Sequence, residues 1–294
     1  MPADASHLTL RSGRLQIALA ALLWSSGGLA IKLVSLPAIG VVFWRSMVTA
    51  LFFILVFRPS VARLRKASLL SAFVYAGMIL TFVSATKMTT AANAIFLQYT
   101  GPLYVLALAP FVLKEPFRKA DAVAIALALS GMSLFFVGRL EAGALAGNLV
   151  AVVSGVFFGG TVLLLRRESR RDSPSDGPMA VLAGNLVAGL LAVPFALASP
   201  GGLQASFALT GRDVLLLLFL GVVQMGVAYA LFVRGLTVVS AAEASLLGML
   251  EPLFNPVWTF LGVGERPSGW AILGGGIVLL AVAGRTLWAA RQRA

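Results

Sequence analysis

The sequence predicts an all-α integral membrane protein in which ten transmembrane helices form two inverted five-helix repeats around a central cavity. The first observation is composition: the 294 residues are 59% hydrophobic and 12% charged, whereas soluble domains carry roughly a quarter charged residues. The second is that charged residues separate apolar runs long enough to cross a bilayer core of about 30 Å. The third is a similarity between the two halves of the chain.

Charges, prolines and glycines divide the chain into ten apolar segments of roughly 20 residues, the length that a membrane-spanning helix needs. The first repeat, 15–138, contains segments 15–34, 38–57, 69–87, 91–113 and 120–138. The second repeat, 144–286, contains segments 144–165, 178–198, 213–234, 241–262 and 268–286. The start of the chain resembles a signal peptide, but its apolar run is too long, so we expect a retained helix.

The basic residues predict the orientation of these helices, because Lys and Arg are enriched in cytoplasmic loops. If the tail 1–14 lies in the cytoplasm, most of the 23 Lys and Arg residues fall on the cytoplasmic side. The external set is Lys32, Lys87, Arg139, Arg212 and Arg266. We therefore expect a multi-pass protein of the plasma membrane, here a bacterial inner membrane, with the tails 1–14 and 287–294 both cytoplasmic.

The evidence for a repeat is a set of matches at an offset of 150 positions. The matching pairs are Ala91-Ala92-Asn93-Ala94 with Ala241-Ala242-Glu243-Ala244, Pro102 with Pro252, and Glu115 with Glu265. We favour a duplication over chance recurrence of alanine and proline. Because each half has five helices, the two repeats are inverted, an arrangement typical of carriers that open a midplane site to each side in turn.

Prolines mark breaks in the fourth and ninth segments, since each proline removes a backbone donor and clashes with the preceding turn. Pro102 follows a glycine, Pro252 follows Glu251, and Asn255 precedes another proline. We interpret Pro102, Pro252 and Asn255 as structural or hinge positions. A packing kink, which is common in transmembrane helices, is the alternative.

Candidate substrate-binding residues begin with one face of the third segment. Tyr75, Ile79 and Phe82 have i, i+4, i+7 spacing, and the offset maps Tyr75 to Met225 and Ile79 to Tyr229. Aromatic and thioether groups suit an apolar ligand surface that tolerates several ligands. We interpret these residues as cavity walls; helix packing and an interfacial aromatic belt are the alternatives.

Polar side chains inside the segments extend this set. Gln98, Tyr99 and Gln224 carry hydrogen-bonding groups that are costly to leave unpaired in a membrane. They bind the ammonium and carboxylate of an amino acid, or form interhelical hydrogen bonds worth on the order of 1 kcal/mol; both readings stay open. Trp24 and Phe158 close the cavity walls or belong to the core.

Ordered motifs in both halves identify a family resemblance. In the first half they are Leu23-Trp24-Ser25, Arg45, Ala85 to Ala91, Pro102 and Leu113-Lys114-Glu115. In the second half they are Gly235 to Ala241, Glu251-Pro252, Gly264-Glu265-Arg266 and Gly274-Gly275-Gly276. The chain thus resembles the drug/metabolite transporter superfamily, specifically its ten-helix EamA-type exporters, and most of all the YddG-type amino-acid exporters. The resemblance implies secondary or facilitative export of amino acids, often aromatic or hydrophobic ones, with some tolerance for organic cations.

Two ionisable residues lie deep within predicted helices, Arg45 and Glu251, where a charge costs about 2.5 to 3.5 kcal/mol. One reading makes Glu251 a substrate-ammonium or proton site and Arg45 a carboxylate partner; the other makes both structural anchors. For Arg45 we favour the structural role, because the resemblance places this arginine in exporters of unrelated substrates. For Glu251 both readings stay open.

Composition excludes several other functions. The chain has no cysteine, and its single histidine, His7, lies in the tail, so we expect no metal site and no cofactor. The net charge of +12 is spread between apolar runs rather than gathered on a soluble face, so we expect no nucleic-acid partner. An intramembrane enzyme is a remote alternative, because the predicted helices contain no histidine and no carboxylate pair. The expected partners are a small-molecule substrate and the lipid bilayer; export of organic cations or drugs is the nearer alternative.

Overall fold

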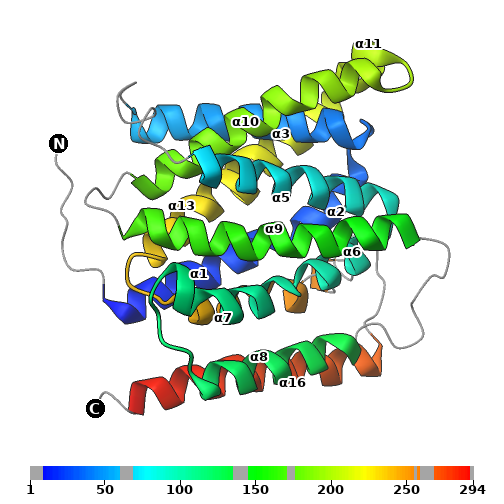
Figure 1. Ribbon diagram of the computed structural model, residues 1–294. Helices are drawn as coiled ribbons and strands as arrows, with labels where there is room; N and C mark the ends of the chain where they lie inside the picture. The colour runs from blue at the N-terminus through cyan, green and yellow to red at the C-terminus, as the bar shows by residue number, and fades with distance from the viewer. Residues whose placement is uncertain are drawn as a thin grey trace.

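The computed structural model describes residues 9–59, 69–134, 145–170, 176–254, 257–258 and 268–291. Within these ranges the chain forms helices and short connections, and no strand. Figure 1 shows the long helices side by side, running roughly parallel or antiparallel to one another. The start of the first helix and the end of the last lie at the same end of this bundle. The predicted all-α class is confirmed.

Short breaks divide several of the predicted segments into two helices. The first half contains α1 (Leu10–Trp24), α2 (Gly27–Leu33), α3 (Ala38–Phe57), α5 (Leu69–Met88), α6 (Ala91–Gln98), α7 (Gly101–Val112) and α8 (Lys119–Ser133). The second half contains α9 (Leu145–Ser169), α10 (Asp176–Ala198), α11 (Gly202–Phe207), α12 (Gly211–Leu218), the π-helix η2 (Phe219–Val227), α13 (Ala228–Gly235), α14 (Ala241–Gly248) and α16 (Gly269–Arg291).

Eight candidate membrane spans occur among the described residues, each long and apolar enough to cross a bilayer. They are Leu10–Leu33, Ala38–Phe57, Leu69–Met88, Ala91–Val112, Leu145–Ser169, Asp176–Ala198, Gly211–Gly235 and Gly269–Trp288, and each corresponds to a predicted segment. The predicted segments 120–138 and 241–262 are described only in part, as α8 and α14 with the residues that follow α14.

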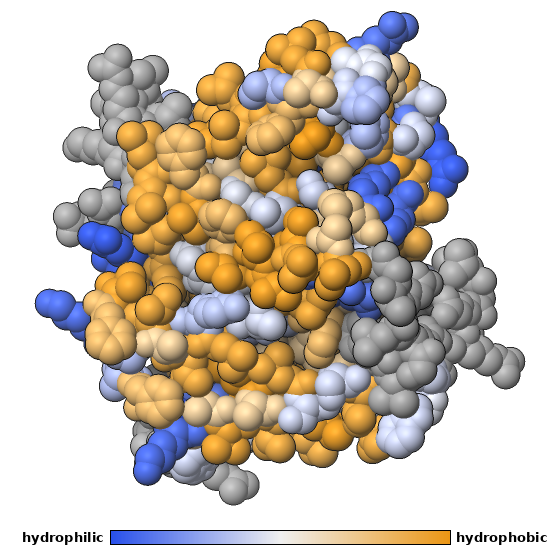
Figure 2. Space-filling model, turned by 45° about the vertical axis from the view of Figure 1, so that its right-hand side comes forward, coloured by the Kyte–Doolittle hydropathy of each residue, from blue (hydrophilic) through white to orange (hydrophobic). Residues whose placement is uncertain are grey.

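The surface is that of a protein surrounded by lipid. Leu55, Phe111, Leu190, Leu215 and Leu280 are each more than 60% exposed, although water would make such exposure unfavourable. Figure 2 shows a face whose middle is mostly apolar and whose most hydrophilic side chains lie toward the edges. Helices suit this environment because they satisfy their backbone hydrogen bonds internally. The chain is a multi-pass integral membrane protein.

Packing places α5 at the centre of the bundle, between α9 and α10, while α3 contacts both α10 and η2. Helix α1 packs along α13 and α14, and α8 pairs with α16 at one edge. Close approach depends on small residues: a Cβ atom at Gly159 of α9 would lie 2.8 Å from the carbonyl oxygen of Gly101. Helix α9 therefore lies directly against the break between α6 and α7.

The two broken helices have matching local structure. Helix α6 starts after Thr90, whose side chain accepts a hydrogen bond from the backbone of Asn93, and α14 starts after Ser240, which accepts from Glu243 in the same way. Helix α6 ends at Gln98 and α14 at Gly248, and helical structure resumes at Gly101 and at Glu251. All of these positions differ by the offset of 150 found in the sequence.

Pro102 and Pro252 each occupy the second residue of the resumed helix. Proline is tolerated there because the first-turn amides of a helix have no intrahelical partner. The prolines therefore mark where a new helix begins, rather than a bend inside a continuous one. Asn255 lies outside the described residues, so its hinge role stays a prediction.

Candidate functional site

A small cavity lies in the middle of the bundle, where both halves of the chain meet. It is lined by Trp24, Arg45, Met78, Ile79, Phe82, Gln98, Phe158, Gln224, Met225, Tyr229 and Glu251. We call this space the central cavity. Its volume is about 30 Å³, enough for water but too small for an amino acid.

Most of the residues that the sequence singles out come together here. Trp24, Ile79, Gln98, Phe158, Gln224, Met225, Tyr229 and Glu251 all line the central cavity. Tyr75 and Tyr99 lie behind this lining: the ring of Tyr75 is 5.0 Å from that of Tyr229, and the ring of Tyr99 is 5.6 Å from that of Phe158. Arg45, Met78 and Phe82 complete the lining; of these, Met78 was not predicted, although it lies on α5 one residue from Ile79.

The aromatic wall of the cavity is built from both halves. The Trp24 ring of α1 lies 4.9 Å from the rings of both Tyr229 and Phe232 on α13. Tyr75 meets Tyr229 edge to face, and its hydroxyl is 3.3 Å from the amide nitrogen of Asn185. Tilted and edge-to-face contacts of this kind stabilise aromatic pairs. The wall is therefore a packed surface that presents ring faces and edges to the cavity.

The amide groups of the cavity come from two different helices. Gln98, at the end of α6, donates to the hydroxyl of Ser154 at 2.8 Å. Gln224 lies in η2 and its amide nitrogen is 3.4 Å from the carbonyl oxygen of Trp24, while its buried carbonyl oxygen has no hydrogen-bond partner. π-Helical turns of this sort occur frequently at functional sites. The side-chain carbonyl oxygen of Gln224 is thus a hydrogen-bond acceptor that a molecule in the cavity can use.

Glu251 lies where the two helix breaks meet. Pro252 has no backbone N–H, so the carbonyl oxygen of Gly248, four residues earlier, has no intrahelical donor. The hydroxyl of Tyr99, in the other break, lies 2.7 Å from that oxygen and 2.8 Å from a carboxyl oxygen of Glu251. A hydroxyl has one proton, so Tyr99 either shares its proton between the two oxygens, or donates it to Gly248 while a protonated Glu251 carboxyl donates to the Tyr99 oxygen.

Arg45 reaches the cavity from α3. Its side chain is buried, and its Nε and Nη1 atoms have no hydrogen-bond partner among the described residues. The sequence favoured a structural role for Arg45, as an anchor to a helix end, and this role stays a prediction; among the described residues, Nε and Nη1 make no hydrogen bond to a backbone carbonyl. The buried cation therefore faces the cavity with donors unused.

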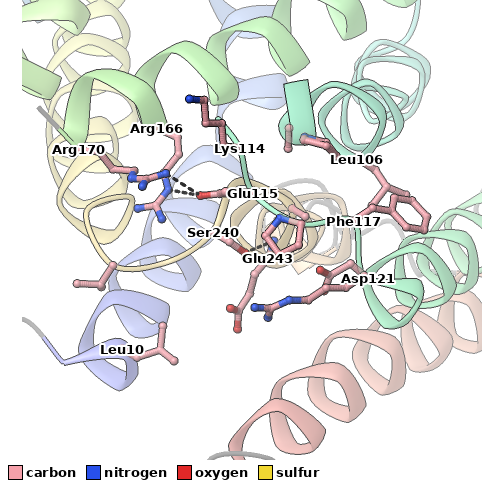
Figure 3. A pocket seen from close by; sticks show the side chains of 16 residues that line it. Leu10, Leu106, Lys114, Glu115, Phe117, Asp121, Arg166, Arg170, Ser240 and Glu243 are labelled. Atoms are coloured by element: carbon pink, nitrogen blue, oxygen red, sulfur yellow. Dashed lines mark hydrogen bonds and ion pairs between the residues drawn. The ribbon is translucent and has the colours of Figure 1, made fainter. Parts of the chain in front are cut away.

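A larger space of about 300 Å³ lies at the end of the bundle where α7 ends and α14 begins. Its charged residues form ion pairs within and around it. In Figure 3, Arg166 and Arg170 point toward Glu115, and the Arg166 Nε atom lies 2.7 Å from the Glu115 carboxylate. The paired residues, which we call the end cluster, are Arg14 with Glu243, Arg166 and Arg170 with Glu115, and Arg285 with Asp121.

The end cluster also binds backbone groups. The second carboxylate oxygen of Glu115 accepts a hydrogen bond of 2.9 Å from the backbone N–H of Ala241, the first residue of α14. Arg166 donates to the carbonyl oxygen of Leu236. These contacts tie α7, α9 and the connection between α13 and α14 together. In the sequence, Glu115 marked the repeat and the family motif, but these contacts were not predicted.

The opposite end is held by two lysines. Lys32 donates to the carbonyl oxygen of Thr89 at 2.7 Å, and Lys87 donates to that of Val34 at 2.6 Å. Nearby, both carboxylate oxygens of Asp213 accept hydrogen bonds from Ser35. Since α7 ends and α14 begins at the same end of the bundle, and their breaks meet at Tyr99, these two broken helices run in opposite directions.

Several known proteins are similar to this chain. YwfM of Bacillus subtilis (strain 168), an uncharacterized transporter, is 28% identical over 69% of each chain. RhtA of Escherichia coli (strain K12), a threonine/homoserine exporter, is 27% identical over 84% of this chain and 81% of its own. A solved crystal structure, described only as that of a protein, has a TM-score of 0.79 with 21% identity and covers 96% of this chain and 100% of its own, which shows the fold.

The EamA-like transporter family matches residues 11–137 and 145–286, so both halves of the chain carry the family pattern. This is a family of transporters, and the two relatives named above are transporters rather than enzymes. The protein belongs to the EamA-like transporter family of the drug/metabolite transporter superfamily.

Proposed function

We propose that this protein exports amino acids, as a secondary or facilitative transporter, by alternating access of the central cavity. The observation that carries the proposal is the lining of that cavity. It combines an aromatic wall with the amides of Gln98 and Gln224, the carboxyl group of Glu251 and the guanidinium of Arg45. An amino acid offers the matching set, an ammonium donor, a carboxylate acceptor and a side chain.

The relatives support the same substrate class. RhtA is named as an exporter of threonine and homoserine, both small zwitterions. The wall formed by Trp24, Phe158 and Tyr229 supports a range that also includes aromatic or hydrophobic amino acids, as in the YddG-type exporters. Trp24 and Phe158 then contact the substrate side chain, and Gln224 offers its unpaired carbonyl oxygen to the substrate ammonium.

Alternating access is supported by the two broken helices. Their breaks are 150 residues apart, they run in opposite directions and they meet at Tyr99, as expected for inverted repeats around a midplane site. Pro102 and Pro252 are then the hinges. Because the cavity of about 30 Å³ cannot hold a substrate, the bundle must open at one end to bind it. The end cluster and the contacts of Lys32 and Lys87 are the contacts that opening breaks.

The proposed location is the bacterial inner membrane, with both termini in the cytoplasm. The distribution of basic residues supports this orientation: the end cluster, with Arg14, Arg166 and Arg285, lies at the end where α1 starts and α16 finishes. The end cluster is then the cytoplasmic gate.

Export of organic cations is the second candidate, and Glu251 is the observation that favours it. A buried carboxyl group in the cavity suits an ammonium or a quaternary cation between aromatic rings. Arg45, in the same lining, opposes a cation without a carboxylate. The two candidates therefore differ in the response to substrates that lack a negative group.

The test is uptake of radiolabelled L-threonine, L-homoserine, L-leucine and L-phenylalanine into liposomes that contain the purified protein, with and without a pH gradient. Saturable uptake of several amino acids is expected. Gln224→Ala should lower it at least several-fold, whereas Gln204→Ala, a matched change at an exposed glutamine of α11, should not. A dependence on the pH gradient would indicate proton coupling. No uptake of any amino acid, with uptake of an organic cation, would reject amino-acid export in favour of the second candidate.

A further inference from the structure

Among the residues that the structure describes, Arg45 has no ion-pair partner. Three arginines are buried among the residues that the structure describes: Arg45 at 2% exposure, Arg166 at 8% and Arg285 at 7%. Arg166 has the carboxylate of Glu115 at 2.7 Å, and Arg285 has that of Asp121 at 2.6 Å. Arg45, the most buried of the three, has no ion pair and two buried N–H donors without partners.

Such an arrangement is unfavourable unless a further group completes it. A guanidinium stays ionised under physiological conditions, and a buried charge needs a partner and hydrogen bonds to offset its loss of hydration. Within a membrane, ionisable residues accordingly face protein partners or a water-filled pathway. Arg45 lines the central cavity, so the completing group must come from the cavity.

We propose that Arg45 binds the carboxylate of the transported substrate, in place of the structural role that the sequence favoured. The inference rests on the proposed amino-acid transport and identifies the carboxylate as the substrate group that Arg45 recognises. The planar fork of arginine donates two parallel hydrogen bonds to a carboxylate along either of two edges, Nε with Nη2 or Nη1 with Nη2, and each edge includes one of the two donors left without a partner, Nε and Nη1. Neutral amides and cations cannot satisfy both charge and geometry.

The other polar groups of the cavity are consistent with this polarity. Glu251 lines the same cavity without an ion pair to Arg45. Tyr229 lines the cavity together with both residues. The cation and the carboxyl group are thus held apart instead of neutralising one another. A zwitterion can bind with its carboxylate on Arg45 and its ammonium toward Glu251.

The test compares each amino acid with its own carboxamide, which keeps the size and the ammonium but has no carboxylate. Liposomes containing the full-length protein take up labelled L-threonine or L-phenylalanine in competition with unlabelled threonine, threoninamide, phenylalanine or phenylalaninamide. For the wild type, the acid should compete roughly 10- to 100-fold better than the amide, the range expected for hydrogen bonds to a charged group.

The variants assign this preference to one residue. Arg45→Gln should bind acid and amide alike, and Arg45→Lys, which keeps the charge but has no fork, should retain only part of the preference. Arg212→Gln, at an exposed arginine at the start of α12, should keep the wild-type ratio. Elution as a single species and an unchanged melting temperature establish that each variant is folded.

Three outcomes would overturn the inference. Equal competition by acid and amide in the wild type would do so without any variant, which covers the case that Arg45→Gln does not fold. A wild-type ratio in folded Arg45→Gln would reject the role of Arg45 and leave amino-acid transport standing. A wild type that takes up no amino acid would reject the proposed function, and the carboxylate site with it.

Discussion

The central cavity and the end cluster treat their charged groups in opposite ways. In the end cluster, each arginine has a carboxylate partner, as Arg166 has Glu115 and Arg285 has Asp121. In the cavity, two guanidinium nitrogens of Arg45 and the side-chain carbonyl oxygen of Gln224 are buried and have no hydrogen-bond partner in the part of the chain that the structure describes. Paired charges fix helices to one another, whereas unpaired ones cost stability and leave binding capacity for another molecule. For the buried arginines, pairing therefore distinguishes those that hold the bundle together, Arg166 and Arg285, from the one that lines the cavity, Arg45.

The largest expected effect is in the end cluster. Asp121→Ala removes the partner of Arg285 in an ion pair whose two side chains are each about 5% exposed or less. An unpaired buried charge should lower the free energy of unfolding by about 3 to 5 kcal/mol, measured by thermal unfolding of the detergent-solubilised protein.

The matched control is the double variant Asp121→Leu with Arg285→Met, which removes both charges together. It should recover most of the lost stability, because apolar residues of similar size replace the pair. If the single variant is as stable as the wild type, the ion pair does not hold α8 to α16. The presence of an ion pair would then not indicate that its residues have a structural role.

An intermediate effect is expected where the two helix breaks meet. Tyr99→Phe removes the donor to the carbonyl oxygen of Gly248 and should cost about 1 to 3 kcal/mol, the penalty for an unsatisfied buried group. Glu251→Gln should keep stability, because its amide can donate to the Tyr99 oxygen as a protonated carboxyl does. Glu251→Ala should not.

The same thermal measurement on Glu251→Gln separates the two roles of this residue. Wild-type stability with lost uptake would assign Glu251 to the substrate or to a proton. Wild-type stability with uptake and pH dependence both intact would make it a structural residue. A large loss of stability in Glu251→Gln would contradict the protonated arrangement.

The smallest expected effect is at Arg45, where Arg45→Gln should change the free energy of unfolding by less than about 1 kcal/mol in the absence of substrate, or increase it, since a buried charge without a partner is removed. Thermal unfolding of Arg45→Gln and Asp121→Ala under the same conditions compares their losses of stability directly. A loss as large as that of Asp121→Ala would mean that Arg45 is held by the protein after all.

The sequence predicted much of this site because helical spacing and the internal offset are local properties. The i, i+4 pattern predicted that Tyr75 and Ile79 share the cavity side of α5, and the offset of 150 mapped them to Met225 and Tyr229; of these four residues, Ile79, Met225 and Tyr229 line the cavity. The eight described spans followed from length and charge in the same way. The types of residue that line the cavity, and the helix faces on which they lie, could therefore be predicted from the sequence.

The ion pairs and hydrogen bonds of these residues could not be predicted from the sequence, because they depend on contacts between distant segments. Glu115 meets Arg166 and Ala241 across 51 and 126 positions, and nothing in their local sequence indicates it. Likewise, nothing in the local sequence indicates that Arg45 has no ion-pair partner among the described residues; its structural role was favoured from the family resemblance. The π-helical turns of η2, which change the direction of Gln224, also lack a local signature.

The contact between Tyr99 and Gly248 also bears on how the protein is made. Each half of the chain carries a helix break, and the carbonyl oxygen that Pro252 leaves open in the second half is met by a hydroxyl from the first. A second half inserted by itself would expose that oxygen and the Glu251 carboxyl to lipid, which has no hydrogen bonds to give. The second half is therefore fully folded only after both halves have been synthesised and have packed against each other.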